Sequence, residues 1–217
     1  NLSSYTTIKV GGVAEYFAEP KSIEELSYLM KWANLNKQRC QIIGAGSNLL
    51  INNIFIKGLI ICTKKLKSLK IEPYSGIVEA EAGVMLPTLS NALAKNGLQG
   101  GEWAVGIPGT LGGAIYMNAG TGNISLAKNL ISVKVINNKT NEELQIEKKD
   151  INFEYRFSSF QSNDLTIISA KLHFEPNGNL EQLIQTTKNN LKLKTETQPY
   201  HLPSFGSVFK NPENNYA

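Results

Sequence analysis

Two glycine-rich segments have the residue types that let bare backbone bind a charged ligand. Residues 106–122 read GIPGTLGGAIYMNAGTG, and 100–122 hold eight of the chain's 18 glycines. Glycine loses more conformational entropy on folding than any other residue, so this density indicates close approach or unusual dihedral angles. We expect a flat, charged ligand to lie against this segment. A glycine-rich corner where helices pack is the alternative.

The second segment is GAGSNLL at 44–50, behind a short apolar run. Such a turn presents successive backbone N–H groups to a phosphate, to which Ser47 and Asn48 add side-chain groups. Residue 49 is Leu, so the dinucleotide fingerprint GxGxxG fails, and no GxxxxGK[ST] motif is present. A β-turn that merely needs a positive φ is the alternative.

The candidate cofactor-binding residues come from both segments. Pro108 restricts the residue before it, the Gly112–Gly113 pair permits close contact, and Asn118 starts a further turn. The full set is Gly44, Ala45, Gly46, Ser47, Asn48, Gly106, Ile107, Pro108, Gly109, Gly112, Gly113, Asn118, Ala119 and Gly120.

Four motifs, taken together and in order, resemble one family. They are GAGSNLL, GIPGTLGGAIYMNAG, the Tyr155–Arg156 pair in INFEYRFS, and GSVFKNP at 206–212. The chain resembles the UDP-N-acetylenolpyruvoylglucosamine reductases, flavoenzymes that complete UDP-N-acetylmuramic acid for peptidoglycan. The resemblance covers essentially the whole chain, from SSYTTIKVGG at 3–12. The lack of an inserted tyrosine-bearing loop before GSVFKNP resembles the shorter subtype.

The resemblance implies FAD between two α+β subdomains, with its pyrophosphate near Gly44–Asn48 and its isoalloxazine near 106–122. It also implies that NADPH reduces the flavin, leaves, and is replaced by the enolpyruvyl ether of a UDP-sugar. A hydride then reaches C3 of that substrate and a proton reaches C2. Such chemistry needs a cation where enolate charge develops, a proton donor and exclusion of water.

Arg156 is the candidate cation. Its permanently charged planar fork suits a carboxylate and an enolate oxygen better than lysine does. Arg156 and Arg39 are the only arginines in the chain, which favours a specific role. An ion pair with Glu154 or Asp164 is the alternative.

The resemblance implies that Ser207 is the proton donor and that Asn211 contacts the nucleotide phosphates of the substrate. A serine hydroxyl is a very weak acid, so Ser207 needs nearby positive charge, for which Lys210 is the candidate. Tyr155 and Lys210 complete the predicted substrate-binding set with Asn211.

The chain departs from the family in two places. Phe205 stands where the family commonly has a small residue, and a bulky ring there narrows the pocket. The family's second acid, a late glutamate, has no counterpart in residues 1–217, and most of the substrate domain is absent. We therefore expect weak FAD binding and poor turnover from this chain.

Several elements must position these residues. Ser22 and Glu25 form a capping box that opens an amphipathic helix. The expected elements are helices at 22–36, 87–95 and 180–194 and strands at 41–43, 59–62, 77–82, 130–136, 143–147 and 165–174. A strand-like run also starts at Val208–Phe209.

Composition limits the function further. The formal charge of +4 is mild, and the lysines of KKLKSLK at 64–70 indicate a solvated face, so we expect no nucleic-acid partner. No apolar run approaches a membrane span, and no signal peptide is apparent.

Cys40 and Cys62 indicate reduced thiols in the cytoplasm, although one disulfide is the alternative. His173 and His201 lack ligand spacing, so we expect no metal. The oligomeric state is left open.

These elements predict an α+β fold without regular βαβ alternation. We expect a first FAD-binding subdomain at 1–71, a second at 72–198, and the beginning of an incomplete substrate domain at 199–217. Two alternatives remain: a different flavin enzyme of this architecture, such as an alcohol oxidase, and a non-catalytic or inactive truncated FAD- or nucleotide-binding module. The first commonly attaches its flavin through a histidine in the phosphate loop, and GAGSN has none.

Overall fold

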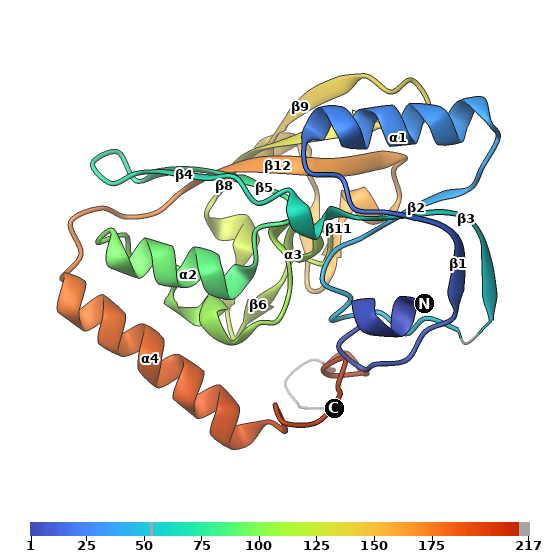
Figure 1. Cartoon of the computed structure of the whole chain (residues 1–217). Coiled ribbons are helices and arrows are strands. Elements are labelled where there is room, and N and C mark those ends of the chain that lie inside the picture. Colours follow the sequence, from blue (N-terminus) through green and yellow to red (C-terminus); the bar gives the residue numbers. More distant parts are fainter. Residues whose placement is uncertain (53, 213–217) are drawn as a thin grey trace.

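The computed structural model describes residues 1–52 and 54–212 and contains two main β-sheets joined by helix α1 (Figure 1). The first sheet is parallel, with strand order β1-β3-β2. Its strands are β1 (Val13–Ala18), β2 (Cys40–Ile43) and β3 (Phe55–Cys62). Because these strands are parallel, their carboxyl ends share one edge, and GAGSNLL leaves β2 at that edge.

The second sheet is antiparallel, with strand order β4-β5-β12-β8-β9. Its strands are β4 (Leu69–Glu72), β5 (Ile77–Glu81), β8 (Leu130–Asn137), β9 (Glu143–Glu147) and β12 (Leu165–His173). The expected subdomain boundary at residue 71 falls inside β4. An α+β fold without regular βαβ alternation is therefore confirmed.

Helix α1 (Ile23–Leu35) serves both sheets. Its buried residues Leu26, Met30 and Ala33 form one apolar cluster with Leu59 and Ile61 of β3 and with Ile136 and Ile168 of the second sheet. The predicted cap is present, because Ser22 Oγ accepts a hydrogen bond from the Glu25 N–H at 3.2 Å. The Glu25 carboxylate accepts from the N–H of Lys21 at 2.7 Å instead of that of Ser22.

The other face of the second sheet carries the largest apolar cluster. There α2 (Leu86–Lys95) and α3 (Leu111–Tyr116) pack through Leu89, Leu93 and Ile115. Helix α4 (Leu180–Thr197) lies along α2 and the short 3-10 helix η3 (Glu102–Gly106) (Figure 1). Two short hairpins complete the fold: β6 (Gly120–Thr121) with β7 (Ile124–Ser125), and β10 (Phe153–Glu154) with β11 (Phe157–Ser158).

One helix was not predicted, and one expected strand was wrong. The glycine segment contains α3, which the density of glycine did not predict; Thr110 caps it and Leu111, Ala114 and Ile115 are buried. The strand expected at Val208–Phe209 is not formed, and both side chains are exposed, at 66% and 77%. No described strand lies beside this run, so its backbone has no ladder partner.

No described helix is both long and apolar enough to cross a bilayer. Cys40 and Cys62 are free thiols, so the disulfide alternative is not realised.

Candidate active site

The two glycine segments lie against each other. A Cβ atom added to Gly44 would lie 2.3 Å from Oγ1 of Thr110, and one added to Gly109 would lie 3.5 Å from Oγ of Ser47. The turn that follows β2 therefore contacts the start of α3, a helix that packs on the second sheet. The two predicted cofactor-binding segments thus lie side by side.

The first turn offers unused hydrogen-bond donors. Among the described residues, the backbone N–H groups of Ala45, Gly46, Ser47 and Asn48 donate to no protein acceptor. The N–H of Thr7 donates to the carbonyl of Gly46 at 3.3 Å, and Oγ1 of Thr7 is buried without a partner. Four successive free N–H groups beside an unpaired hydroxyl match the needs of a phosphate or pyrophosphate.

Several glycines lie so close to other residues that a side chain would not fit. A Cβ at Gly112 would lie 2.9 Å from the Cβ of Ala82, and one at Gly120 would lie 2.1 Å from the carbonyl oxygen of Ile124. A Cβ at Gly46 would lie 2.0 Å from the carbonyl oxygen of Tyr5. Close packing thus accounts for Gly112 and Gly120, and Gly46 has φ +67°, as the β-turn alternative for its segment requires. At Gly113 the nearest atom would lie at 3.5 Å, an ordinary contact.

Tyr155 and Arg156 form the two-residue turn of the β10–β11 hairpin. Arg156 has φ +56°, a left-handed conformation that glycine or asparagine usually supplies. Its guanidinium carbon lies 4.9 Å from the centroid of the Tyr155 ring. Asp164 pairs with Lys139 at 2.6 Å, and Arg156 makes no ion pair within the described residues, so the ion-pair alternative is not observed.

The hairpin is fixed to the end of α3. The side-chain N–H of Asn118 donates to the carbonyl of Glu154 at 2.8 Å, and Ser158 Oγ donates to the carbonyl of Tyr116 at 2.8 Å. Oδ1 of Asn118 is buried without a partner. The glycine segment and the predicted catalytic arginine are thus parts of one hydrogen-bonded unit.

The segment that follows α4 crosses this region. The Tyr200 hydroxyl donates to the carbonyl of Gly106, and the N–H of Ser204 donates to the carbonyl of Thr7 at 3.2 Å. The N–H of Asn211 donates to the Tyr155 hydroxyl at 3.4 Å, so two predicted substrate contacts lie together. Ser207 and Lys210 are exposed, and within the described residues no hydrogen bond joins them to each other or to Arg156.

Two groups near the turns keep their protons. Burial raises the pKa of the Cys62 thiol, which donates to the carbonyl of Gly44 at 3.5 Å. Burial also raises the pKa of Tyr200. Because only the protonated forms donate, both hydrogen bonds persist well above neutral pH.

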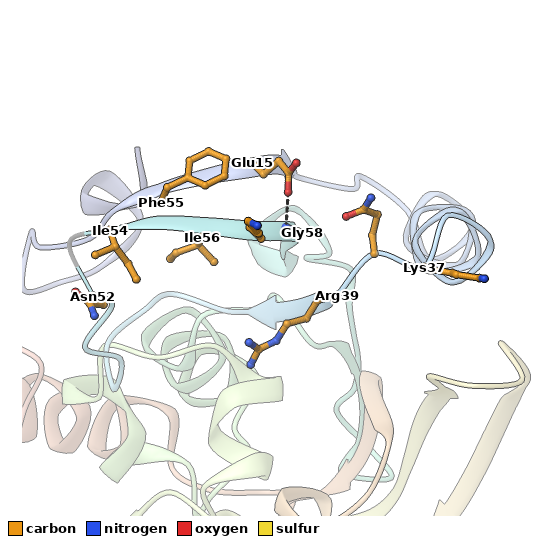
Figure 2. Close-up of a pocket in the computed structure, with 10 residues that line it drawn as sticks. Glu15, Lys37, Arg39, Asn52, Ile54, Phe55, Ile56 and Gly58 are labelled. Carbon is orange, nitrogen blue, oxygen red and sulfur yellow. Dashed lines mark hydrogen bonds between the residues drawn. The ribbon is translucent and has the colours of Figure 1, made fainter.

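A cavity of about 640 Å³ lies elsewhere, at the amino ends of β2 and β3 (Figure 2). Glu15 lines it and accepts a hydrogen bond from the N–H of Gly58 at 2.8 Å, drawn as a dashed line (Figure 2). None of the predicted site residues lines this cavity. In the part of the chain that the structure describes, no group of three or more His, Cys, Asp or Glu residues could hold a metal ion.

Sequence reasoning missed four residues of this region: Thr7, Thr110, Gln161 and Tyr200. A signal existed for Thr110, because a threonine before an apolar residue is a typical N-cap. For Thr7, Gln161 and Tyr200 no local pattern was available, since each makes its contact with a residue distant in the sequence.

The fold defines an FAD-binding domain. Residues 14–144 match the family described as FAD binding domain. A Phl p 4 variant described as a glucose oxidase shares the fold, with a TM-score of 0.56 at 14% identity over 76% of this chain and 36% of its own.

Closer relatives are more specific. The UDP-N-acetylenolpyruvoylglucosamine reductase of Prochlorococcus marinus subsp. pastoris is 72% identical over 217 residues, which are 100% of this chain and 73% of that protein. That of Synechococcus sp. (strain RCC307) is 43% identical over 98% of this chain and 70% of its own. The crystal structure of the reductase (MurB) from Thermus caldophilus gives a TM-score of 0.81 at 28% identity, over 100% of this chain and 75% of that one. The chain belongs to the UDP-N-acetylenolpyruvoylglucosamine reductase family, whose members are oxidoreductases of peptidoglycan synthesis that use FAD and NADPH.

Proposed function

We propose that the two glycine segments of this chain bind FAD, and that Arg156 and Ser207 act on an enolpyruvyl ether of a UDP-sugar. FAD would accept a hydride from NADPH and supply it to C3 of that substrate. The observation that carries the proposal is the row of free N–H groups at Ala45–Asn48 beside the start of α3. These groups would hold the pyrophosphate, while Gly113 and Asn118 would lie along the rest of the cofactor.

Arg156 would bind the carboxylate of the substrate and stabilise negative charge on its oxygen. A planar guanidinium forms two parallel hydrogen bonds with a carboxylate. The fixed hairpin supports this role, because Arg156 keeps a left-handed backbone without an acidic partner in the described chain. Backbone strain of this kind is often found at functional positions.

Ser207 would give a proton to C2 of the substrate, and Tyr155, Lys210 and Asn211 would bind its nucleotide part. The hydrogen bond between Asn211 and Tyr155 supports a shared role for these two. Ser207 is exposed on the segment between Ser204 and Asn211, so a substrate could reach it.

We further propose that the two sheet units act as FAD-binding subdomains and that 199–217 begins a substrate-binding unit, whose last five residues lie outside the described residues. We also propose the cytoplasm as the compartment of the enzyme, which the two free thiols support. The partner is the small-molecule substrate.

The two half-reactions test these roles separately. NADPH should bleach the flavin absorbance of the wild type and of Ser207→Ala at the same rate. Reoxidation by the enolpyruvyl substrate should be about 100- to 10,000-fold slower in Ser207→Ala, because a general acid contributes that much. Ser75→Ala, in an exposed turn, is the matched control. Equal reoxidation rates in Ser207→Ala and the wild type would remove Ser207 from the mechanism.

A further inference from the structure

Arg156 adopts a backbone conformation that an arginine seldom keeps. Of the two residues in the β10–β11 turn, only Arg156 has a positive φ, at +56°. A left-handed conformation of a residue with a side chain persists only where its surroundings fix it. Some contact must therefore hold this peptide.

The side-chain amide of Gln161 supplies that contact. Its Nε2 lies 3.2 Å from the carbonyl oxygen of Arg156 and 2.9 Å from the carbonyl oxygen of Tyr116, the last residue of α3. A primary amide has two N–H donors, one for each carbonyl. Gln161 thus links the turn to the end of the helix that starts in the glycine segment.

The other anchors hold different parts of the hairpin. Asn118 bonds the carbonyl of Glu154, on β10, while the hydroxyl of Ser158, on β11, bonds Tyr116. Within the described residues, Gln161 alone donates to a backbone carbonyl of the turn itself. Loss of its amide would leave both strands anchored and free only the peptide that aims the guanidinium.

We propose that Gln161 is a positioning residue that holds Arg156 in the orientation needed to bind the substrate carboxylate. This inference rests on the proposed role of Arg156. It predicts that Gln161 affects the affinity for the substrate carboxylate and not the affinity for the rest of the ligand.

Two ligands separate that effect from a general loss of structure. UDP-N-acetylmuramate carries a carboxylate and UDP-N-acetylglucosamine lacks it, so the ratio of their affinities reports on Arg156. Calorimetry with the FAD-loaded protein should give about a fivefold smaller ratio in Gln161→Met, the effect of losing the hydrogen bond to the Arg156 carbonyl. Gln161→Lys keeps donors for both carbonyls and should restore the ratio to within about twofold of the wild type. Gln145→Met on β9 removes an amide that, within the described residues, bonds only Glu147, and it is the matched control.

The double variant completes the test. In an Arg156→Met background, Gln161→Met should not lower the ratio further, because the two residues act through one contact. If Gln161→Met keeps the wild-type ratio while Arg156→Met loses it, the positioning role is overturned and the proposed function stands. If Arg156→Met keeps the ratio, the role of Arg156 fails and the inference fails with it. Thermal unfolding of each variant confirms that the protein tested is folded, and equal losses in Gln161→Lys and Gln161→Met would also overturn the proposal.

Discussion

Oγ1 of Thr110 occupies the space where a side chain on Gly44 would begin. The distance from an ideal Cβ on Gly44 to that oxygen would be 2.3 Å, below any normal contact. Thr110 also caps α3 by accepting a hydrogen bond from the N–H of Gly113 at 3.4 Å. The two glycine segments therefore meet at a residue whose own position is fixed by the helix it starts.

Gly44→Ala should destabilise the protein by about 1–3 kcal/mol, the usual cost of overpacking, and should weaken FAD binding. In a Thr110→Ala background the nearest remaining atom is the Cβ of residue 110 at 3.4 Å, so the same change should cost much less there. Denaturant unfolding of the four proteins in this cycle measures the coupling, which should be at least about 1 kcal/mol. Additive costs would show that the two segments do not meet as described.

Gly113→Ala should separate packing from cofactor binding. Its Cβ would make only ordinary contacts, so alanine in this helix should stabilise the apoprotein by about 0.5–1 kcal/mol. If Gly113 lies against FAD, the same methyl group should weaken FAD binding about tenfold, measured by flavin fluorescence. Gly97→Ala, outside both glycine segments, is the control: its Cβ would make only an ordinary contact but its φ is +69°, so it should lower stability and leave FAD affinity unchanged. Unchanged FAD affinity in Gly113→Ala would place the cofactor elsewhere.

Tyr200→Phe should loosen the start of the glycine segment. The Tyr200 hydroxyl donates to the carbonyl of Gly106, and loss of this hydrogen bond should cost about 1 kcal/mol of stability and speed FAD release. Tyr74→Phe removes a hydroxyl from a side chain that is 95% exposed and should change neither quantity. Equal FAD release rates in the wild type and Tyr200→Phe would contradict this role.

Stability should fall in alkali because of Cys40. Burial raises the pKa of this thiol from 9.0 to about 11, so between those values the folded state keeps a proton that the unfolded state has lost. The contribution of Cys40 is complete below about pH 9 and is lost as the pH rises toward 11, with a size near 1 kcal/mol after allowance for its partial exposure. Urea unfolding at pH 8, 9.5 and 11 should show a steeper fall for the wild type than for Cys40→Ala. Parallel curves would show that the thiol is not desolvated.

Local patterns predicted most of the regular elements. The Ser22–Glu25 cap gave α1 to within one residue at each end, and the antiparallel strand Glu143–Glu147 was predicted with its observed bounds. Such elements can be predicted from the spacing of their apolar residues and from their capping residues, which a single sequence shows. The family membership predicted from the four motifs is confirmed by the close relatives.

The missed features depend on contacts between distant residues. Helix α3 contains two glycines and forms because its apolar face is buried beneath the second sheet, a tertiary effect that overrides propensity. The hydrogen bonds of Gln161 join the end of α3 to the β10–β11 turn, and no spacing in the sequence displays this link. The roles of the site residues stay predictions, since those roles concern ligands.

The position of α1 has a consequence for how the chain folds during its synthesis. The apolar face of this helix is completed by Ile136 and Ile168, which leave the ribosome more than 100 residues later. Until then Leu26 and Met30 remain partly uncovered, and exposed apolar surface of this kind promotes aggregation of nascent chains. The apolar face of α1 is thus completed only after β12 has been made, so the early translation product should depend on chaperones.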